Sequence, residues 1–433
     1  MFLRIVFNFF KRNYDETKSG GIKVILRKVK TFIKIIIFSP YFLIVLFFLL
    51  IIYLIKPLIL IRFGNLSSSR LGHFAADTEL YLCELDAGVN IPKEKFKDFF
   101  YFDDVSNEQI AKMWKRKLKI FPGFLIKPFF LLNKILSLFL PYFKNHIVMP
   151  TQSDRDVHNL MDNFSPHISF TEDEKKDDED FLKKFGLSKK SKFVCLIVRD
   201  SKYLKERFPE KDWMYSDHRN YEINNFLDAA NELTKKGYYI FRMGSKVEKK
   251  FDNKNKMIID YANLKERSDF LDVYLGANCN FCITTSCGFD AIPSIFRRPV
   301  AYITVPLQYF FTFSSNYLII TKHHFSKKMK KKLNFSELSE IEIGECEVTS
   351  DYKKKDIELI ENSPEEIKDF VIEMADRVEN KWTEGANEKK IQNDFWENYK
   401  IKLLNKGNKN HLHGKLIAKF SISFLKRNPE WLL

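Results

Sequence analysis

The sequence predicts an α/β protein built around open parallel β-sheets, and three observations support this class. Near-continuous apolar runs, of which 192–198 is the clearest, suit strands that are buried on both faces of a sheet. Amphipathic helical segments alternate with these runs, and the loops between them are short. Residues 58–64 form an apolar strand that ends in glycine and leads into a helical segment, which is how an α/β domain typically begins.

The elements of the second half follow in order along the chain. After the strand at 192–198, an amphipathic helix is expected over 221–236, because its apolar residues recur at helical spacing and Gly237 suits its C-terminal end. Ser268 is a candidate N-cap for a second helix that ends near residue 278. Four further strands are expected at 237–244, 256–262, 279–284 and 299–304.

Changes in composition along the 433 residues indicate the domain boundaries, since the charged stretch 170–192 separates two regions of α/β pattern. The first part of the chain is predicted to hold a basic N-terminal tail and a membrane-embedded helix, and the last part a helical extension with a basic tail. The predicted parts are the tail at 1–34, the membrane helix at 35–56, an N-terminal domain at 57–170, a C-terminal domain at 191–350 and the extension at 351–433.

Most of the net charge of +15 lies at the two ends of the chain. Residues 1–34 carry nine basic and two acidic residues (net +7), and residues 401–433 carry seven basic and one acidic residue (net +6), so the ends contribute +13. A nucleic-acid-binding protein would more often carry its basic residues across the folded body. Basic ends fit the surface of an anionic membrane better, so the membrane is an expected partner and nucleic acid is not.

The apolar run 35–55 contains 21 residues without a charge, which is long enough to cross a bilayer as a helix. It could span the membrane, or it could enter and return at Ser39-Pro40, because proline interrupts helical hydrogen bonding. A second apolar stretch, 118–143, suits either an interfacial helix or a buried helix pair. We predict a re-entrant or surface-lying anchor with the catalytic body on the cytoplasmic face, against the alternative of a single span with the body outside.

The six cysteines are scattered and form no disulfide framework, which favours reduced thiols and a cytosolic body. Cys279 and Cys282 have CxxC spacing, but a zinc site would need a second pair, and the sequence has none. We therefore expect no metal site and no cofactor.

Polar residues cluster where the predicted strands of the second domain end. Ligands in open α/β sheets bind beyond the carboxyl ends of the strands, and arginines and backbone N–H groups before a helix suit a phosphate. A lone arginine at a strand end is usually a surface ion pair, and a Ser/Thr-Gly cluster is usually a helix cap, so the prediction rests on their combination. The predicted contacts of a nucleotide sugar are Arg199, Arg242, Gly244, Asp260, Thr284, Thr285, Ser286 and Gly288.

Two other polar segments supply further candidates. His73 and Asp77 are four residues apart and lie on one helical face, so His73 or, failing that, Asp77 could act as the general base that accepts the acceptor's proton. A structural hydrogen bond between the two is the simpler interpretation. Arg219, in the polar segment 217–225, is a further candidate contact of the nucleotide sugar, although this segment could equally be a solvated helix cap.

Several blocks resemble a family of bacterial glycosyltransferases from surface-polysaccharide gene clusters. The blocks include "RFGNLSSSRLGHFAADTELYL", "KFVCLIVRDSKYL" and "DHRNYEINNFLDAANELTKKGYYIFRMG", and the resemblance covers about residues 58–345. The block "SDFLDVYLGANCNFCITTSCG" is also distantly similar to fucosyltransferase-like enzymes with two domains.

The resemblance implies a GT-B fold, in which two Rossmann-like domains bind the acceptor and the nucleotide sugar respectively. It implies that Arg199, Arg242, Thr285, Ser286 and Gly288 hold the donor, and that no metal is needed. The expected function is a membrane-associated transfer of a sugar from a nucleotide-sugar donor to a glycan or lipid-linked glycan in cell-envelope polysaccharide assembly. A non-enzymatic membrane adaptor that binds a nucleotide or a phosphoglycan is the alternative.

Overall fold

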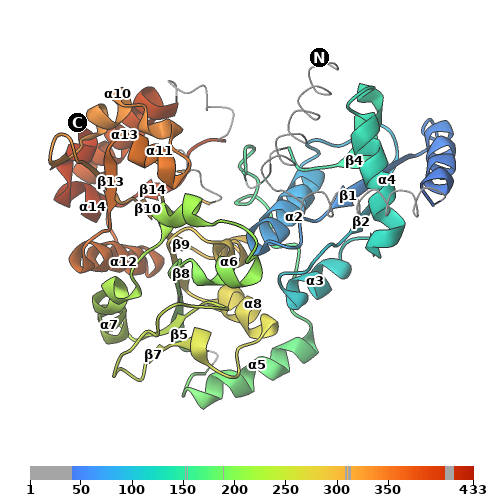
Figure 1. Ribbon diagram of the computed structural model, residues 1–433. Helices are drawn as coiled ribbons and strands as arrows, with labels where there is room; N and C mark the ends of the chain where they lie inside the picture. Colours follow the sequence, from blue (N-terminus) through green and yellow to red (C-terminus); the bar gives the residue numbers. More distant parts are fainter. Residues whose placement is uncertain are drawn as a thin grey trace. The chain divides into compact units, whose positions relative to one another are not determined.

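The computed structural model divides into two compact units (Figure 1). It describes residues 41–151, 153, 155–188, 190–307, 310, 314–404 and 414–433. Unit 1 comprises the described residues of 1–67, 91–103 and 118–149, and unit 2 those of 68–90, 104–117 and 150–433. Three segments of the predicted 57–170 domain, 68–90, 104–117 and the described residues of 150–170, thus belong to unit 2.

Unit 1 contains a four-stranded parallel sheet in the order β3-β2-β1-β4. The expected first strand is present as β1 (Leu60–Asn65), which lies between β2 (Phe96–Tyr101) and β4 (Ile147–Val148). The short strand β3 (Ile120–Phe121) forms the other edge beside β2. This order agrees with the expected parallel α/β class.

The helices of unit 1 are strongly apolar. Residues 41–54 are helical, and α4 (Gly123–Leu136) and the 3₁₀-helix η1 (Pro141–His146) follow β3. No helix within the described residues is long and apolar enough to cross a membrane. Residues 35–40 of the predicted membrane helix lie outside the described residues, as does the tail at 1–34.

Unit 2 is built on a seven-stranded sheet in which every neighbouring pair is parallel. The chain runs outward from β5 through β6 to β7, returns to β8 beside β5, and continues outward through β9 and β10. This is the strand order of a doubly wound Rossmann fold, in which the direction of winding switches between β5 and β8. The strands are β5 (Lys192–Ile197), β6 (Tyr238–Arg242), β7 (Ile258–Ile259), β8 (Phe281–Thr284), β9 (Val300–Ile303) and β10 (Tyr317–Ile320), with β14 (Lys419–Phe420) at the far edge.

Helices connect and flank these strands. They are α2 (Leu71–Asp86), α3 (Glu108–Lys115), α5 (Glu172–Lys184), α6 (Lys202–Arg207), α7 (Leu227–Lys235), α8 (Asp269–Asn278), α9 (Ala291–Ile295), α10 (Phe335–Glu340), α11 (Thr349–Lys354), α12 (Pro364–Val378), α13 (Ala386–Tyr399) and α14 (Ile422–Arg427). A small antiparallel sheet contains β11 (His323–Ser326), β12 (Lys331–Lys332) and β13 (Ile357–Ile360).

Two parts of unit 2 differ from the sequence interpretation. The charged boundary stretch is largely α5, whose start is stabilised by a capping box between Thr171 and Glu174. The helical extension also contributes a strand, because β14 pairs with β10 and enlarges the main sheet. The capping box of α5 is a local signal, whereas β14 has no strong local pattern and is revealed only by its packing.

Candidate functional site

The site lies where the winding of the unit 2 sheet switches, at the carboxyl ends of β5 and β8. Ligands of doubly wound sheets bind at this position. Arg199 follows β5, and the loop 285–288 follows β8. The backbone N–H of Arg199 donates to Thr285 Oγ1 at 2.8 Å, and the N–H of Thr285 donates to the carbonyl of Ile197 at 3.2 Å. These bonds join the two strand ends.

Two arginines at this position have no carboxylate within 4.0 Å among the described residues. Arg199 donates to Ser216 Oγ at 2.8 Å, and Arg219 donates to the carbonyl oxygen of Ser286. The Nε atoms of both guanidinium groups are buried without a hydrogen-bond partner. Burial and, after it, the charge of Arg219 together lower the pKa of Arg199 to about 10. Two partly buried like charges that make no direct ion pair with a described carboxylate indicate a site for an anion.

Two neighbouring basic residues are also shifted by burial, and His218 in addition senses the charges of the two arginines. Burial lowers the pKa of His218 to about 3, and the charges of Arg219, Arg199 and Lys322 add to this effect, so His218 is neutral. Burial also lowers the pKa of Lys322 to about 8, although Glu361 opposes this shift. The charges of Arg199 and Arg219 therefore surround a neutral His218, and they would favour a bound anion.

The loop after β8 is held by internal hydrogen bonds. Thr284 Oγ1 donates to Asp290 Oδ2 at 3.1 Å, and the N–H of Cys287 donates to the same oxygen at 3.0 Å. Burial raises the pKa of Asp290 to about 6, although these two hydrogen bonds act to lower it. Ser286 has a φ of 66°, a left-handed conformation that is uncommon for residues other than glycine. The two threonines thus shape the loop, while Ser286 Oγ lies 3.4 Å from Arg219 Nη2.

Gly288 serves a close approach between the loop and the start of α2. A Cβ atom on Gly288 would lie 3.1 Å from the backbone nitrogen of Gly72, and a Cβ on Gly72 would lie 3.2 Å from Gly288 Cα. A side chain at either position would therefore push α2 away from the loop. The run of small residues after β8 is explained at least in part by this contact.

The contact brings the predicted His73–Asp77 pair close to the anion site. His73 Nδ1 lies 3.3 Å from Asp77 Oδ2, so the predicted i,i+4 contact is present. Ser153 Oγ donates to Asp77 Oδ2 at 2.7 Å and lies 3.4 Å from His73 Nδ1. If Nδ1 of the neutral ring donates to Asp77, the lone pair is on Nε2, and this is the tautomer that a general base requires.

The predicted residues at the ends of β6 and β7 are used elsewhere. Arg242 is 1% exposed, and it donates to Asp260 Oδ1 at 3.0 Å and to the carbonyl of Lys249 at 3.1 Å. Asp260 also accepts hydrogen bonds from the backbone of Phe251 and the side chain of Asn263. We therefore leave Arg242 and Asp260 out of the anion site, because each neutralises the other.

Gly244 has a structural role in a turn. Its φ is 146°, and a Cβ atom there would lie 2.6 Å from Val247 Cγ1. Its carbonyl oxygen accepts a hydrogen bond from Arg267 Nε at 3.0 Å. These contacts explain the glycine without a ligand.

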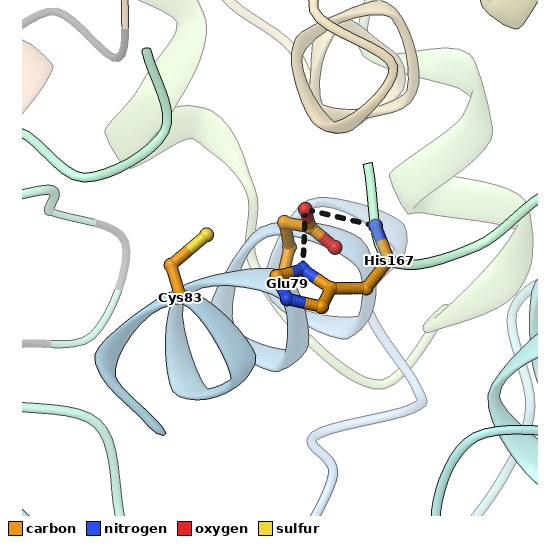
Figure 2. Close-up of side chains that lie close together, drawn as sticks. All are labelled: Glu79, Cys83 and His167. Carbon is orange, nitrogen blue, oxygen red and sulfur yellow. Dashed lines mark hydrogen bonds and ion pairs between the residues drawn. The ribbon is translucent and has the colours of Figure 1, made fainter. Parts of the chain in front are cut away.

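A second cluster, which was not expected from the sequence, consists of Glu79, Cys83 and His167 (Figure 2). Their ligand atoms lie within 4.8 Å of one another, a spacing that could suit a metal ion. However, Arg297 Nη2 lies 2.6 Å from Glu79 Oε1 and 3.7 Å from Cys83 Sγ. Burial also raises the pKa of the Cys83 thiol, which disfavours the thiolate that a metal would need. The guanidinium group takes the place of a metal ion.

Ion pairs of this cluster instead join α2 to two segments of unit 2 that are distant along the chain, those of His167 and Arg297. His167 Nδ1 lies 3.0 Å from Glu79 Oε1, and its Nε2 lies 3.0 Å from Asp86 Oδ2. Burial lowers the pKa of His167, but hydrogen bonds with Cys83 and Glu79 outweigh this effect and raise it to about 10. The protonated ring therefore bridges two carboxylates of α2 near neutral pH.

This pKa makes the stability of unit 2 depend on pH. The pKa of His167 in the folded state lies above the ordinary value of 6.5, so the stabilisation is complete below pH 6.5 and is lost as the pH rises towards 10. After allowance for solvent screening, we expect a loss of about 1–2 kcal/mol between pH 7 and 9.5. Chemical denaturation across this pH range should show a smaller loss of unfolding free energy for His167→Gln than for the parent protein. The control is His158→Gln, at an exposed histidine, and an equal loss in both variants would contradict the assignment.

No protein-family model matches the chain, and no curated protein matches it. Solved structures are similar to it over about 60% of its length. Three of them are ADP-heptose LPS heptosyltransferase II of E. coli (12% identity, TM-score 0.37, 60% of this chain and 90% of that chain), a family 9 glycosyltransferase of Veillonella parvula (11%, 0.37, 61% and 86%) and the E. coli heptosyltransferase WaaC with ADP (13%, 0.28, 60% and 91%). At TM-scores below 0.5, these similarities support no argument about activity.

Proposed function

We propose that this chain is a GT-B glycosyltransferase that moves a sugar from a nucleotide-sugar donor to a glycan acceptor. The observation that carries the proposal is the pair Arg199 and Arg219, which lies at the switch point of a doubly wound sheet without a carboxylate within 4.0 Å among the described residues. A diphosphate would supply the missing negative charge and bind two guanidinium groups through several charge-assisted hydrogen bonds. The resemblance of about residues 58–345 to polysaccharide glycosyltransferases favours a sugar nucleotide over other nucleotides.

The proposed reaction exchanges one bond at the anomeric carbon of the donor sugar. The bond from this carbon to the diphosphate oxygen breaks, and its electron pair remains on the leaving nucleoside diphosphate. The oxygen of an acceptor hydroxyl bonds to the same carbon, and the hydroxyl proton moves to His73 Nε2. Asp77 orients the ring and stabilises its protonated form, as their 3.3 Å contact allows.

Arg199 and Arg219 would stabilise the charge that develops on the leaving diphosphate. Because guanidinium groups supply this positive charge, the proposal includes a reaction without a metal ion. Transfer should then proceed at an unchanged rate in the presence of EDTA.

The proposal also includes a cytoplasmic location at the membrane and a glycan or lipid-linked acceptor of cell-envelope polysaccharide assembly. All six cysteines are free thiols, which suits a reducing compartment. Nucleotide sugars are made in the bacterial cytosol, and the basic ends of the chain suit an anionic membrane surface.

The test uses the full chain with a panel of UDP-, GDP-, ADP-, dTDP- and CMP-sugars. The cognate donor should raise the melting temperature by mass action, and its labelled sugar should pass to a lipid-extractable or polymeric product when bacterial membranes are added. If no donor stabilises the protein, the anion site is not a nucleotide site. If a donor binds but no sugar is transferred to any acceptor, the chain is the nucleotide-binding adaptor instead.

The His73 pair gives a prediction that separates chemistry from binding. We expect His73→Gln to lower the turnover about 100-fold, since a positioned general base typically contributes about 10²–10⁴-fold. The donor-induced rise in melting temperature should remain as in the parent protein. His158→Gln, at an exposed histidine of the same unit, should change neither quantity. Turnover of His73→Gln at more than a third of the parent rate would remove His73 from the mechanism.

A further inference from the structure

Unit 1 exposes an unusually large number of apolar side chains on two helices. On the helix 41–54, Leu43, Phe47 and Leu54 are 68%, 60% and 79% exposed. On α4 and the turn that follows it, Phe124 and Leu138 are 70% and 66% exposed. Soluble proteins rarely expose apolar patches of this extent unless a membrane or another protein covers them. We call the exposed apolar residues of 41–58 and 123–142 the apolar face.

The two helices lie against each other and against the unit 1 sheet. Tyr53 OH donates to Asn133 Oδ1 at 2.7 Å, and Tyr41 OH donates to the carbonyl of Phe124. Val45 and Leu49 are 2% and 0% exposed, because they pack in one cluster with Phe63, Tyr101 and Phe130. The helix 41–54 therefore buries one side in its own domain and exposes the other.

This packing distinguishes between a helix that spans a membrane and a helix that lies in the membrane interface. A helix that spans a bilayer alone is surrounded by lipid on all sides, whereas Val45 and Leu49 contact the sheet of unit 1. An interfacial helix buries only one apolar side in the lipid, which matches the exposed residues of both helices. The two adjacent helices would enter the same interface, so residues 41–54 need not act alone.

The charges beside the apolar face favour an anionic bilayer over a protein. Residues 41–58 and 123–146 contain four lysines and no acidic residue, and two of the lysines, Lys56 and Lys127, pair with Glu94 and Asp103. Lys134 and Lys144 are exposed and make no ion pair among the described residues. Lys56 lies 4.2 Å from the ring centre of Tyr142, which is itself 46% exposed. Lysines and tyrosines beside an apolar surface are typical of the membrane interface, where the ammonium groups reach the headgroups.

We propose that the apolar face is a monotopic membrane-binding surface, in which α4 and the turn 137–142 enter an anionic bilayer beside the helix 41–54. This surface would be the part of the chain that makes the membrane association included in the proposed function. Its membrane binding does not depend on sugar transfer. The surface explains why an uncharged run of 21 residues is followed so closely by the first strand of a folded domain.

The test probes the turn after α4 separately from the apolar N-terminal run. A fluorophore that senses polarity is attached at Leu138→Cys in the full chain and, as a matched control, at Met329→Cys in unit 2, where the methionine is 52% exposed. Vesicles of phosphatidylcholine with phosphatidylglycerol should shift the emission of the probe at 138 to the blue, and brominated acyl chains should quench it. The probe at 329 should show neither change. Absence of both changes at 138, with vesicles bound to the protein, would overturn the proposal.

A charge variant completes the test. Leu138→Glu/Leu140→Glu should lower the fraction of protein that floats with these vesicles at least tenfold, with the melting temperature and donor-induced stabilisation unchanged. Met214→Glu/Met329→Glu, at exposed methionines of unit 2, should float like the parent. If the leucine variant floats normally but changes from an oligomer to a monomer in sedimentation, the apolar face is a contact between copies and the proposal is wrong. Donor binding is measured without vesicles, so failure of the site and failure of the surface remain distinguishable.

Discussion

Replacement of Arg199 by methionine is expected to weaken the binding of the cognate nucleoside diphosphate about 10- to 100-fold and, at the same time, to raise the melting temperature of the ligand-free protein. A charge-assisted hydrogen bond contributes about 1.5–3 kcal/mol, which accounts for the loss of affinity. The gain in stability has a different cause. Arg199 and Arg219 are like charges without a carboxylate within 4.0 Å among the described residues, and each disfavours the charge of the other.

The measurement is calorimetric titration of the diphosphate together with thermal unfolding, for Arg199→Met and Arg219→Met. Both variants should show the same two opposite changes. Arg427→Met is the control, because Arg427 is an arginine of the same unit that pairs with Asp369 on the surface. If both test variants bind the cognate nucleotide as tightly as the parent does, these guanidinium groups do not hold its phosphates.

Arg242→Met is expected to have the opposite effect on stability. Its guanidinium group is 1% exposed and pairs with Asp260, so the substitution leaves a carboxylate without its cation. Removal of one partner from a buried ion pair typically costs about 3–5 kcal/mol. Asp260 keeps hydrogen bonds from Phe251 and Asn263, so we expect a loss near the lower end, about 3 kcal/mol.

Chemical denaturation, followed by a spectroscopic signal that reports the unfolding of unit 2, measures this loss of stability. The double variant Arg242→Met/Asp260→Asn should recover most of it, because the carboxylate that lost its partner is then neutral. Nucleotide affinity, measured below the unfolding transition, should stay within about threefold of the parent value, which corresponds to less than 1 kcal/mol. An Arg242→Met protein that is as stable as the parent but no longer binds the nucleotide would return Arg242 to the site.

The sequence alone determined the α/β class, most of the strands of the main sheet and the position of Arg199 and the 284–288 loop at strand ends. These features depend on short apolar runs for the strands and on the helical spacing of apolar residues between them, and such local patterns are set by neighbours along the chain. The i,i+4 contact of His73 and Asp77 could be predicted for the same reason, since helical geometry fixes that spacing.

Only the tertiary structure decided which of the candidate side chains have partners. Arg199 and Arg242 both follow buried strands and are equivalent by pattern, but Asp260 lies beside Arg242 while no carboxylate lies within 4.0 Å of Arg199 among the described residues. Several contacts join residues that are tens to hundreds of positions apart in the chain. They are the approach of Gly72 to Gly288, the ion pairs of Glu79 with His167 and Arg297, and the pairing of β5 with β8. Such contacts depend on the order in which strands pack and on the volume and charge that remain between them, and these quantities exist only once the whole unit is folded.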